Sequence, residues 1–180
     1  MLGSFAFFWL APATVAGFLP WFFTGWRRGP ALFDGDFSRW LGATLALVGV
    51  IVVIECFARF AMRGLGTPAP VAPTRHLVVS GFYRHVRNPM YFGVVMAILG
   101  QALWFGSTAL LIYGGVVWAF FFVFILLYEE PTLARQFGSE YLAYRKHVPR
   151  WLPRIGRTPQ ENCPRNVDRG EAGSTTQRIK

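Results

Sequence analysis

The distribution of hydrophobic residues along the chain predicts four helices that are long enough to cross a membrane. A membrane-spanning helix needs about 20 consecutive, mostly apolar residues, and four stretches of the chain approach that length. They cover roughly residues 4–24, 41–62, 90–106 and 108–128. We therefore expect an all-α fold, an integral membrane bundle of about four transmembrane helices.

The third and fourth apolar stretches are separated only by the short turn FGST, residues 105–108. So short a connection forces two consecutive helices to run antiparallel as a hairpin. The residues before the third helix and those after the fourth should therefore meet on one face of the membrane.

The first apolar stretch contains Pro12 and Pro20, which are expected to bend it. Neighbouring helices can satisfy the carbonyl groups that a proline leaves without a donor. Neither Lys nor Arg precedes this stretch, and it is long for the apolar part of a signal peptide. We interpret it as a retained membrane span.

The segment after the fourth stretch predicts an amphipathic cytoplasmic helix that starts at Pro131 and lies near the membrane. Gly138 is expected to weaken or kink this helix. Few apolar residues follow, and 156–180 is expected to be a disordered basic tail, which leaves 1–155 as a single transmembrane domain. The apolar face of the helix repeats every three or four residues and consists of Leu133, Phe137, Tyr141, Tyr144 and Val148.

Composition and charge agree with a membrane protein. Hydrophobic residues make up 53% of the 180 residues and charged residues only 15%, too apolar a balance for an ordinary soluble domain. The net charge is +9, and ten of the 18 Lys and Arg residues follow residue 128, while others lie at 63–88. The positive-inside tendency places both regions, and with four spans both termini, in the cytoplasm. We therefore expect membrane lipids and no nucleic acid as partners.

Polar residues gather where the predicted hairpin begins, in the sequence YRHVRNPMYFG. On one interpretation Arg87 marks the cytoplasmic end of the helix, Pro89 starts it and Tyr91 belongs to the interfacial aromatic belt. On the other, Arg87 and Asn88 bind polar groups of a ligand while Tyr91 stacks or forms a hydrogen bond. The three histidines, His76, His85 and His147, share no metal-ligand spacing, and we expect no metal site.

Two pairs of charged residues, each containing glutamate, also have two interpretations each. Glu129 and Glu130 follow the fourth apolar stretch, where they would either favour the next helix N-terminus and pair with a nearby arginine, or bind a cofactor. Glu55 and Arg59 lie four residues apart inside the second stretch, a spacing that favours an ion pair along a helix. That pair would be structural or would line a substrate pocket.

Three motifs together resemble one family of small membrane enzymes, the isoprenylcysteine carboxyl methyltransferase and phospholipid methyltransferase superfamily. The motifs are GFYRHVRNPMYFG, ILGQALWFGS and EEPTLARQFGSEYLAYRKHVPRWLP, and the resemblance covers roughly residues 75–153. Its pattern is R-[HN]-P-x-Y-x-G, a helical hairpin, and then E-E-x-x-L-x-x-x-F-G-x-x-Y-x-x-Y. This chain has Asn88 where many members carry His, which still allows a hydrogen bond to a ligand.

The resemblance implies S-adenosyl-L-methionine as methyl donor, bound at the cytoplasmic ends of the last two spans and closed over by the C-terminal segment. Arg87 and Glu130 are then the expected catalytic residues. The residues expected to bind the cofactor are Tyr83, Arg87, Asn88, Pro89, Tyr91, Gly93, Glu129, Glu130, Tyr141 and Tyr144.

The function that the resemblance implies is methyl transfer to a lipid-like or hydrophobic acceptor at the cytoplasmic membrane face. The acceptor would be the carboxylate of an isoprenylcysteine-type molecule, the amine of a phospholipid, or another hydrophobic small molecule. Two alternatives belong to other classes. One is an NADPH-dependent membrane reductase of the sterol-reductase type, whose members usually have more spans. The other is a non-enzymatic membrane scaffold.

Overall fold

The computed structural model describes residues 9–33, 35–63, 77 and 79–151, and every regular element in these ranges is helical. The predicted tail and most of the connector before the third apolar stretch lie outside the described residues. The elements, of which η1 and η3 are π-helices and η2 is a 3-10 helix, are η1 (Trp9–Phe18), α2 (Leu19–Thr24), α3 (Gly35–Arg63), η2 (Gly81–Arg84), α4 (Pro89–Phe105), α5 (Thr108–Phe124), η3 (Ile125–Glu129) and α6 (Glu130–His147).

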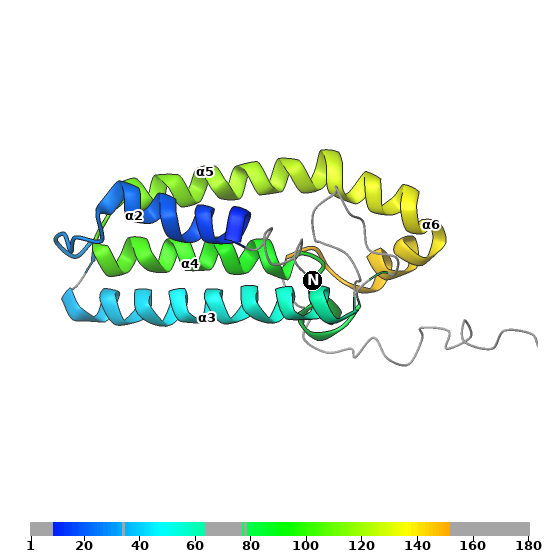
Figure 1. Cartoon of the computed structure of the whole chain (residues 1–180), viewed down its shortest axis with the longest axis horizontal. Coiled ribbons are helices and arrows are strands. Elements are labelled where there is room, and N and C mark those ends of the chain that lie inside the picture. The colour runs from blue at the N-terminus through cyan, green and yellow to red at the C-terminus, as the bar shows by residue number, and fades with distance from the viewer. Residues whose placement is uncertain (1–8, 34, 64–76, 78, 152–180) are drawn as a thin grey trace, which may run out of the picture.

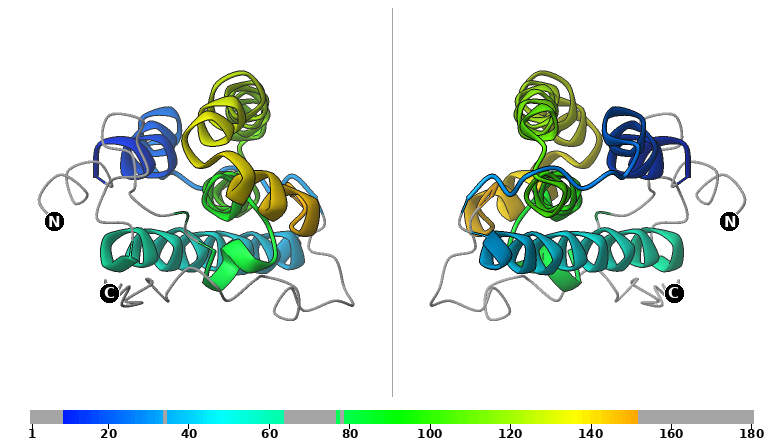
Figure 2. Two further views of the ribbon diagram at one scale, coloured as in Figure 1. Left: turned by 90° about the vertical axis from the view of Figure 1, so that its right-hand side faces the viewer. Right: turned by 90° about the vertical axis from the view of Figure 1, so that its left-hand side faces the viewer.

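Helices α2, α3, α4 and α5 lie alongside one another along the long axis of the molecule, and α6 turns away at one end (Figure 1). The end views show that α3 crosses α4 at an angle (Figure 2). Two helices, Asp36–Arg59 and Thr108–His147, are long and apolar enough to cross a membrane, and α4 is a shorter apolar helix. The all-α prediction is confirmed for the described residues, whereas the number of spans stays a prediction.

Helices α3 and α4 approach each other closely through glycines spaced seven residues apart on each helix. A Cβ atom at Gly49 would lie 2.6 Å from the carbonyl oxygen of Gly93, and one at Gly100 would lie 2.6 Å from that of Gly42. Real side chains do not tolerate such distances, so only glycine permits this contact. Small residues are the usual means by which membrane helices pack without a hydrophobic driving force.

The N-terminal helix is joined to the hairpin by hydrogen bonds that compensate for a proline. Pro20 has no N–H group to donate to the carbonyl of Ala16, four residues earlier. The side chain of Gln101 in α4 donates to that carbonyl instead, at 2.7 Å, and the Tyr113 hydroxyl of α5 donates to the carbonyl of Val15 at 2.9 Å. Neighbouring helices therefore satisfy the carbonyls of a proline-bent helix, as the sequence predicts.

The predicted hairpin is present. Helix α4 ends at Phe105, and its C-cap, Gly106, has a left-handed φ of 67°. The Ser107 hydroxyl accepts a hydrogen bond from the backbone N–H of Leu110 at the start of α5. These are common signals for the end of one helix and the beginning of the next.

The chain passes from α5 into α6 without a break in helical structure, which the predicted boundary near residue 128 did not foresee. Pro131 lies in the first turn of α6 and is preceded by the π-helical turn of η3. A wider turn accommodates the proline ring without ending the helix. Gly138, with φ 51° and ψ −124°, kinks α6 as expected, and the second half of the helix turns back towards the bundle (Figure 1).

Helix α3 also differs from expectation, because it begins at Gly35, earlier than the apolar stretch that starts near residue 41. Asp36 lies in its first turn, where a negative charge favours a helix N-terminus. An apolar window locates the part of a helix that can lie in lipid, whereas the helix itself continues into polar residues.

Candidate functional site

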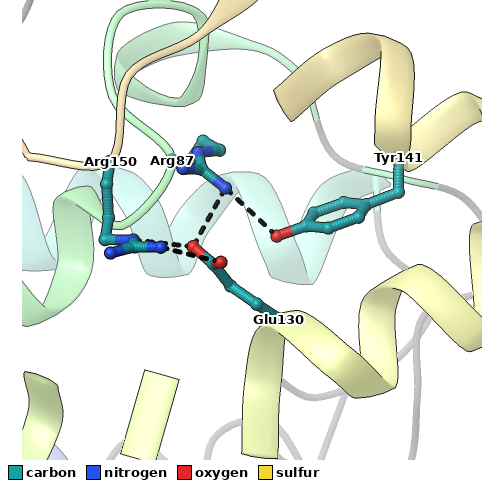
Figure 3. Close-up of polar contacts among 4 residues, drawn as sticks. All are labelled: Arg87, Glu130, Tyr141 and Arg150. Carbon is teal, nitrogen blue, oxygen red and sulfur yellow. Dashed lines mark hydrogen bonds and ion pairs between the residues drawn. The ribbon is translucent and has the colours of Figure 1, made fainter. Parts of the chain in front are cut away.

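The hairpin and the turn at Gly138 bring Arg87, Glu130 and Tyr141 together at one end of the bundle. Arg87 Nη1 donates to Glu130 Oε1 at 2.9 Å and to the Tyr141 hydroxyl at 3.4 Å (Figure 3). The side chains of Arg87 and Glu130 are only 9% and 8% exposed. Burial makes this ion pair costly to break from one side, since the remaining charge would be left without a partner.

Arg150, which follows α6, binds the same carboxylate as Arg87 and completes the network. Its Nε donates to Glu130 Oε1 at 2.8 Å and its Nη2 donates to Oε2 at 2.9 Å (Figure 3). This paired arrangement is the strongest geometry between a guanidinium and a carboxylate. The hydrogen bond to Glu130 raises the pKa of Arg150 above its already high ordinary value. Both oxygens of Glu130 are thus engaged by arginines.

Two further contacts hold the segment after α6 against the bundle. The backbone N–H of Arg87 donates to the carbonyl of Pro149 at 2.9 Å. The Trp151 ring lies 4.3 Å from that of Trp118 in α5, measured between centroids. No site role is predicted for Arg150 or Trp151 from the sequence. The sequence shows only that an Arg-Trp pair follows the predicted amphipathic helix. This local pattern does not predict that Arg150 binds Glu130.

Glu129 lies beside Glu130 but has different neighbours. It forms a hydrogen bond with the hydroxyl of Tyr91 in α4, and the Tyr91 ring packs 4.8 Å from that of Phe121 in α5. The second carboxylate oxygen of Glu129, Oε2, is buried and has no hydrogen-bond partner within the described part of the chain. A buried carboxylate oxygen without a donor costs free energy, and a bound ligand with a donor group removes that cost.

Asn88 presents a second polar group of this kind. It stands at the N-cap of α4, where an asparagine side chain normally accepts a hydrogen bond from the helix, but its side chain forms no capping bond. Asn88 is 6% exposed, and its Nδ2 has no partner among residues 9–33, 35–63, 77 and 79–151; the same holds for Nε of Arg87. Two donors and one acceptor, all buried, fit a polar ligand with both acceptor and donor groups.

The other residues expected at the site have mainly structural contacts. The Tyr144 hydroxyl donates to the carbonyl of Tyr83 at 2.6 Å, and the Tyr83 ring is buried beside Cys56 and Met90. Burial raises the pKa of the Tyr83 phenol well above its ordinary value, so the ring stays neutral. Pro89 begins α4 and is buried, and Gly93 packs against α3.

An apolar cavity of about 690 Å³ lies between the N-terminal helix, α3 and α4. Val53 and Val94 line it, and each lies about one helical turn from a member of the buried cluster that contains Tyr83. One part of the cavity therefore lies close to the buried cluster around Tyr83, and its lining suits a hydrophobic molecule.

Residues 37–140 match the family model described as phospholipid methyltransferase. Individual relatives are similar over shorter or longer parts of the chain. The protein-S-isoprenylcysteine O-methyltransferase of Schizosaccharomyces pombe is 39% identical over 80 residues, which cover 44% of this chain and 34% of the relative. The mouse enzyme of the same name is 34% identical over 125 residues, covering 64% of this chain and 42% of the relative.

One relative, whose name gives a different substrate, aligns with a larger part of this chain. The methanethiol S-methyltransferase of Pseudomonas deceptionensis is 32% identical over 140 residues, which cover 74% of this chain and 49% of the relative. The chain therefore spans about a third to a half of the length of these curated relatives.

Proposed function

Because the chain belongs to the phospholipid methyltransferase family, we propose that it transfers a methyl group from S-adenosyl-L-methionine to a hydrophobic acceptor at the cytoplasmic membrane face. The observation that carries this proposal is the set of buried polar atoms without partners in the described ranges, on Arg87, Asn88 and Glu129. They come from two of the three motifs that resemble the superfamily, and they fit a polar cofactor with donor and acceptor groups.

S-adenosyl-L-methionine, when bound, supplies an electrophilic methyl group on a positively charged sulfur. The chain's own contribution is to hold the donor and to exclude water. Glu129 offers a carboxylate oxygen to a donor group or to a positive charge, and Asn88 offers an amide N–H to an acceptor. The hydrogen bond from Tyr91 fixes the orientation of the Glu129 carboxylate. Direct displacement needs mainly such alignment, which can supply most of the rate enhancement.

The Glu130 network would serve this site as a positioning element. Glu130 binds both Arg87 and Arg150, so the segment after α6 is held beside Arg87, close to the start of α4. Closing an active site in this way removes water and strengthens every electrostatic contact inside it. Glu130 and Arg87 stay the expected catalytic pair from the sequence, and the geometry favours a positioning role for Glu130.

The acceptor would reach the site from the bilayer. The apolar cavity beside α3 and α4 can hold its hydrophobic part, while the reacting group would meet the donor near Glu129. An acceptor carboxylate or thiolate needs no general base, whereas an amine has to lose a proton, which Glu129 can accept. The printed names of the relatives, an O-methyltransferase and an S-methyltransferase, concern two different acceptors, so we propose only a hydrophobic acceptor here.

Binding of S-adenosylhomocysteine, measured by calorimetry on protein purified in detergent, tests the cofactor. We expect saturable binding of this ligand and none of NADPH; the reverse result would favour the reductase alternative, and no binding of either would favour the scaffold. Incubation of membrane lipid extracts with isotopically labelled S-adenosyl-L-methionine, followed by mass spectrometry, then identifies the acceptor. Absence of any labelled product would contradict the proposed activity.

A further inference from the structure

A second polar pocket lies on the side of η2 that faces α3, and it shares no lining residue with the Arg87–Glu130 network. Its volume is about 570 Å³. The described residues that line it are Glu55, Arg59, Val79, Ser80, Gly81, Phe82, Arg84 and His85.

The Glu55–Arg59 pair predicted from the sequence is formed and lies directly against Gly81. Arg59 Nε donates to Glu55 Oε1. Gly81 has a left-handed φ of 62°, and a Cβ atom at this position would collide with both members of the pair. The glycine therefore lets the pair reach the backbone of η2 and form one wall of the pocket.

Two polar atoms in the pocket lining point to a ligand. Ser80 is 8% exposed, and neither its hydroxyl oxygen nor Oε2 of Glu55 has a hydrogen-bond partner in the part of the chain that the structure describes. Both atoms are buried, so each carries a cost that a ligand group of suitable chemistry removes. Glu55 Oε2 requires a donor, and the Ser80 hydroxyl can donate or accept.

The net charge of the pocket lining and the position of the pocket relative to the membrane indicate which class of ligand it binds. Two arginines face one glutamate in the lining, which leaves an excess of one positive charge and favours a ligand with one negative charge. Arg59 is the last residue of the membrane-capable segment Asp36–Arg59, so the pocket lies at the level of lipid headgroups if that segment spans the bilayer. Val79 and Phe82, 41% and 38% exposed, add apolar surface to the same lining.

We propose that this pocket binds the headgroup of an anionic phospholipid that carries hydroxyl groups, such as phosphatidylglycerol, at a site separate from methyl transfer. Arg84 and the N–H groups of Arg59 that are not used by Glu55 bind the phosphodiester, together with the Ser80 hydroxyl. A headgroup hydroxyl donates to Glu55 Oε2, and the acyl chains pass over Val79 and Phe82. Basic pockets beside membrane helices commonly recognise lipid headgroups in this way.

Titration of the purified full chain in detergent with short-chain phosphatidylglycerol, phosphatidylethanolamine and phosphatidylcholine, followed by thermal unfolding, tests the proposal. We expect phosphatidylglycerol to bind at least tenfold more tightly than phosphatidylcholine, a difference of about 1.4 kcal/mol. Equal binding of these two lipids would overturn the proposal. Equal binding of phosphatidylethanolamine would overturn the requirement for negative charge, and equally tight binding of soluble glycerol phosphate would show a free phosphate ligand instead.

Pairs of matched variants test whether phosphatidylglycerol binds in this pocket. Arg84→Gln and Ser80→Ala should lower the affinity for phosphatidylglycerol at least fivefold, whereas Arg135→Gln, an exposed arginine of α6, should leave it unchanged. Gly81→Ala should also lower it by displacing the Glu55–Arg59 pair, and Gly115→Ala, which meets nothing within 4 Å, is its control. S-adenosylhomocysteine binding by each variant reports that the fold is intact. Equal losses in Arg84→Gln and Arg135→Gln would overturn the site.

Discussion

Glu129 and Glu130 are adjacent in the sequence, both are largely removed from solvent, and their surroundings are opposite. Both oxygens of Glu130 accept hydrogen bonds from arginines that belong to two distant parts of the chain. Glu129 has one hydrogen bond, with Tyr91, and its Oε2 has no partner in the described ranges. Neighbours on a helix point about 100° apart, so one glutamate can hold the chain together while the other faces a ligand.

The difference between the two glutamates separates a role in the stability of the fold from a role in ligand binding. A carboxylate whose hydrogen bonds are complete contributes mainly to the folded structure, because its removal strands buried charges. A carboxylate oxygen that is buried without a partner lowers the stability of the fold and has the capacity to bind a donor group of a ligand. If the two glutamates differ in this way, substitutions at the two positions should affect different measurements.

The largest effect is expected for Glu130→Ala. It leaves the buried Arg87 without its carboxylate and releases Arg150, and breaking a buried ion pair from one side costs about 3 kcal/mol or more. Denaturant unfolding in detergent measures this loss, with Glu140→Ala as control, because Glu140 is an exposed residue of the same helix. S-adenosylhomocysteine affinity should fall at least tenfold. If the two variants unfold alike, the network does not stabilise the fold.

Glu129→Gln should have the reverse profile. The amide keeps an oxygen that can accept from Tyr91, so the free energy of unfolding should stay near that of the unsubstituted protein. S-adenosylhomocysteine affinity should fall at least tenfold, about 1.4 kcal/mol, because the negative charge is lost. A loss of stability as large as that of Glu130→Ala, with S-adenosylhomocysteine binding retained, would show that Glu129 stabilises the fold and does not bind the ligand.

Arg150→Gln sharpens the role of the segment after α6. The Arg150 side chain is 25% exposed, and water can replace part of its interaction, so we expect a loss of about 1 kcal/mol in unfolding free energy. Amide hydrogen exchange should become faster at residues 148–151 while exchange in α3 and α4 is unchanged. Arg145→Gln, on the exposed part of α6, is the matched control; equal exchange in both variants would remove Arg150 from the network.

The smallest effect is expected for Asn88→Ala. Removing a buried amide whose Nδ2 has no partner in the described chain should not lower stability, whereas S-adenosylhomocysteine affinity should fall about threefold, equivalent to a weak neutral hydrogen bond of about 0.7 kcal/mol. Asn88→His introduces the residue that many members of the superfamily carry, and it should keep most of the affinity. Unchanged binding by Asn88→Ala would leave the amide without a role in the site.

The sequence alone determined the features that depend on local pattern. The apolar stretches located α3, α4 and α5, the four-residue turn around Gly106 made the hairpin, and the spacing of Glu55 and Arg59 made their pair. The joint motif also identified the superfamily, which the family match confirms. Each of these follows from helical periodicity, from turn chemistry, or from contacts between residues a few positions apart.

Only the tertiary structure decided which glutamate is engaged and by which residues. Arg150 reaches Glu130 because α6 kinks at Gly138 and the chain turns back, and no local pattern specifies the direction of that return. The pocket at Gly81 likewise requires η2 to lie against α3, although residues 64–80 of the sequence separate the two elements. Pairing between distant residues depends on how helices rotate and pack against one another, which the order of residues along the chain does not reveal.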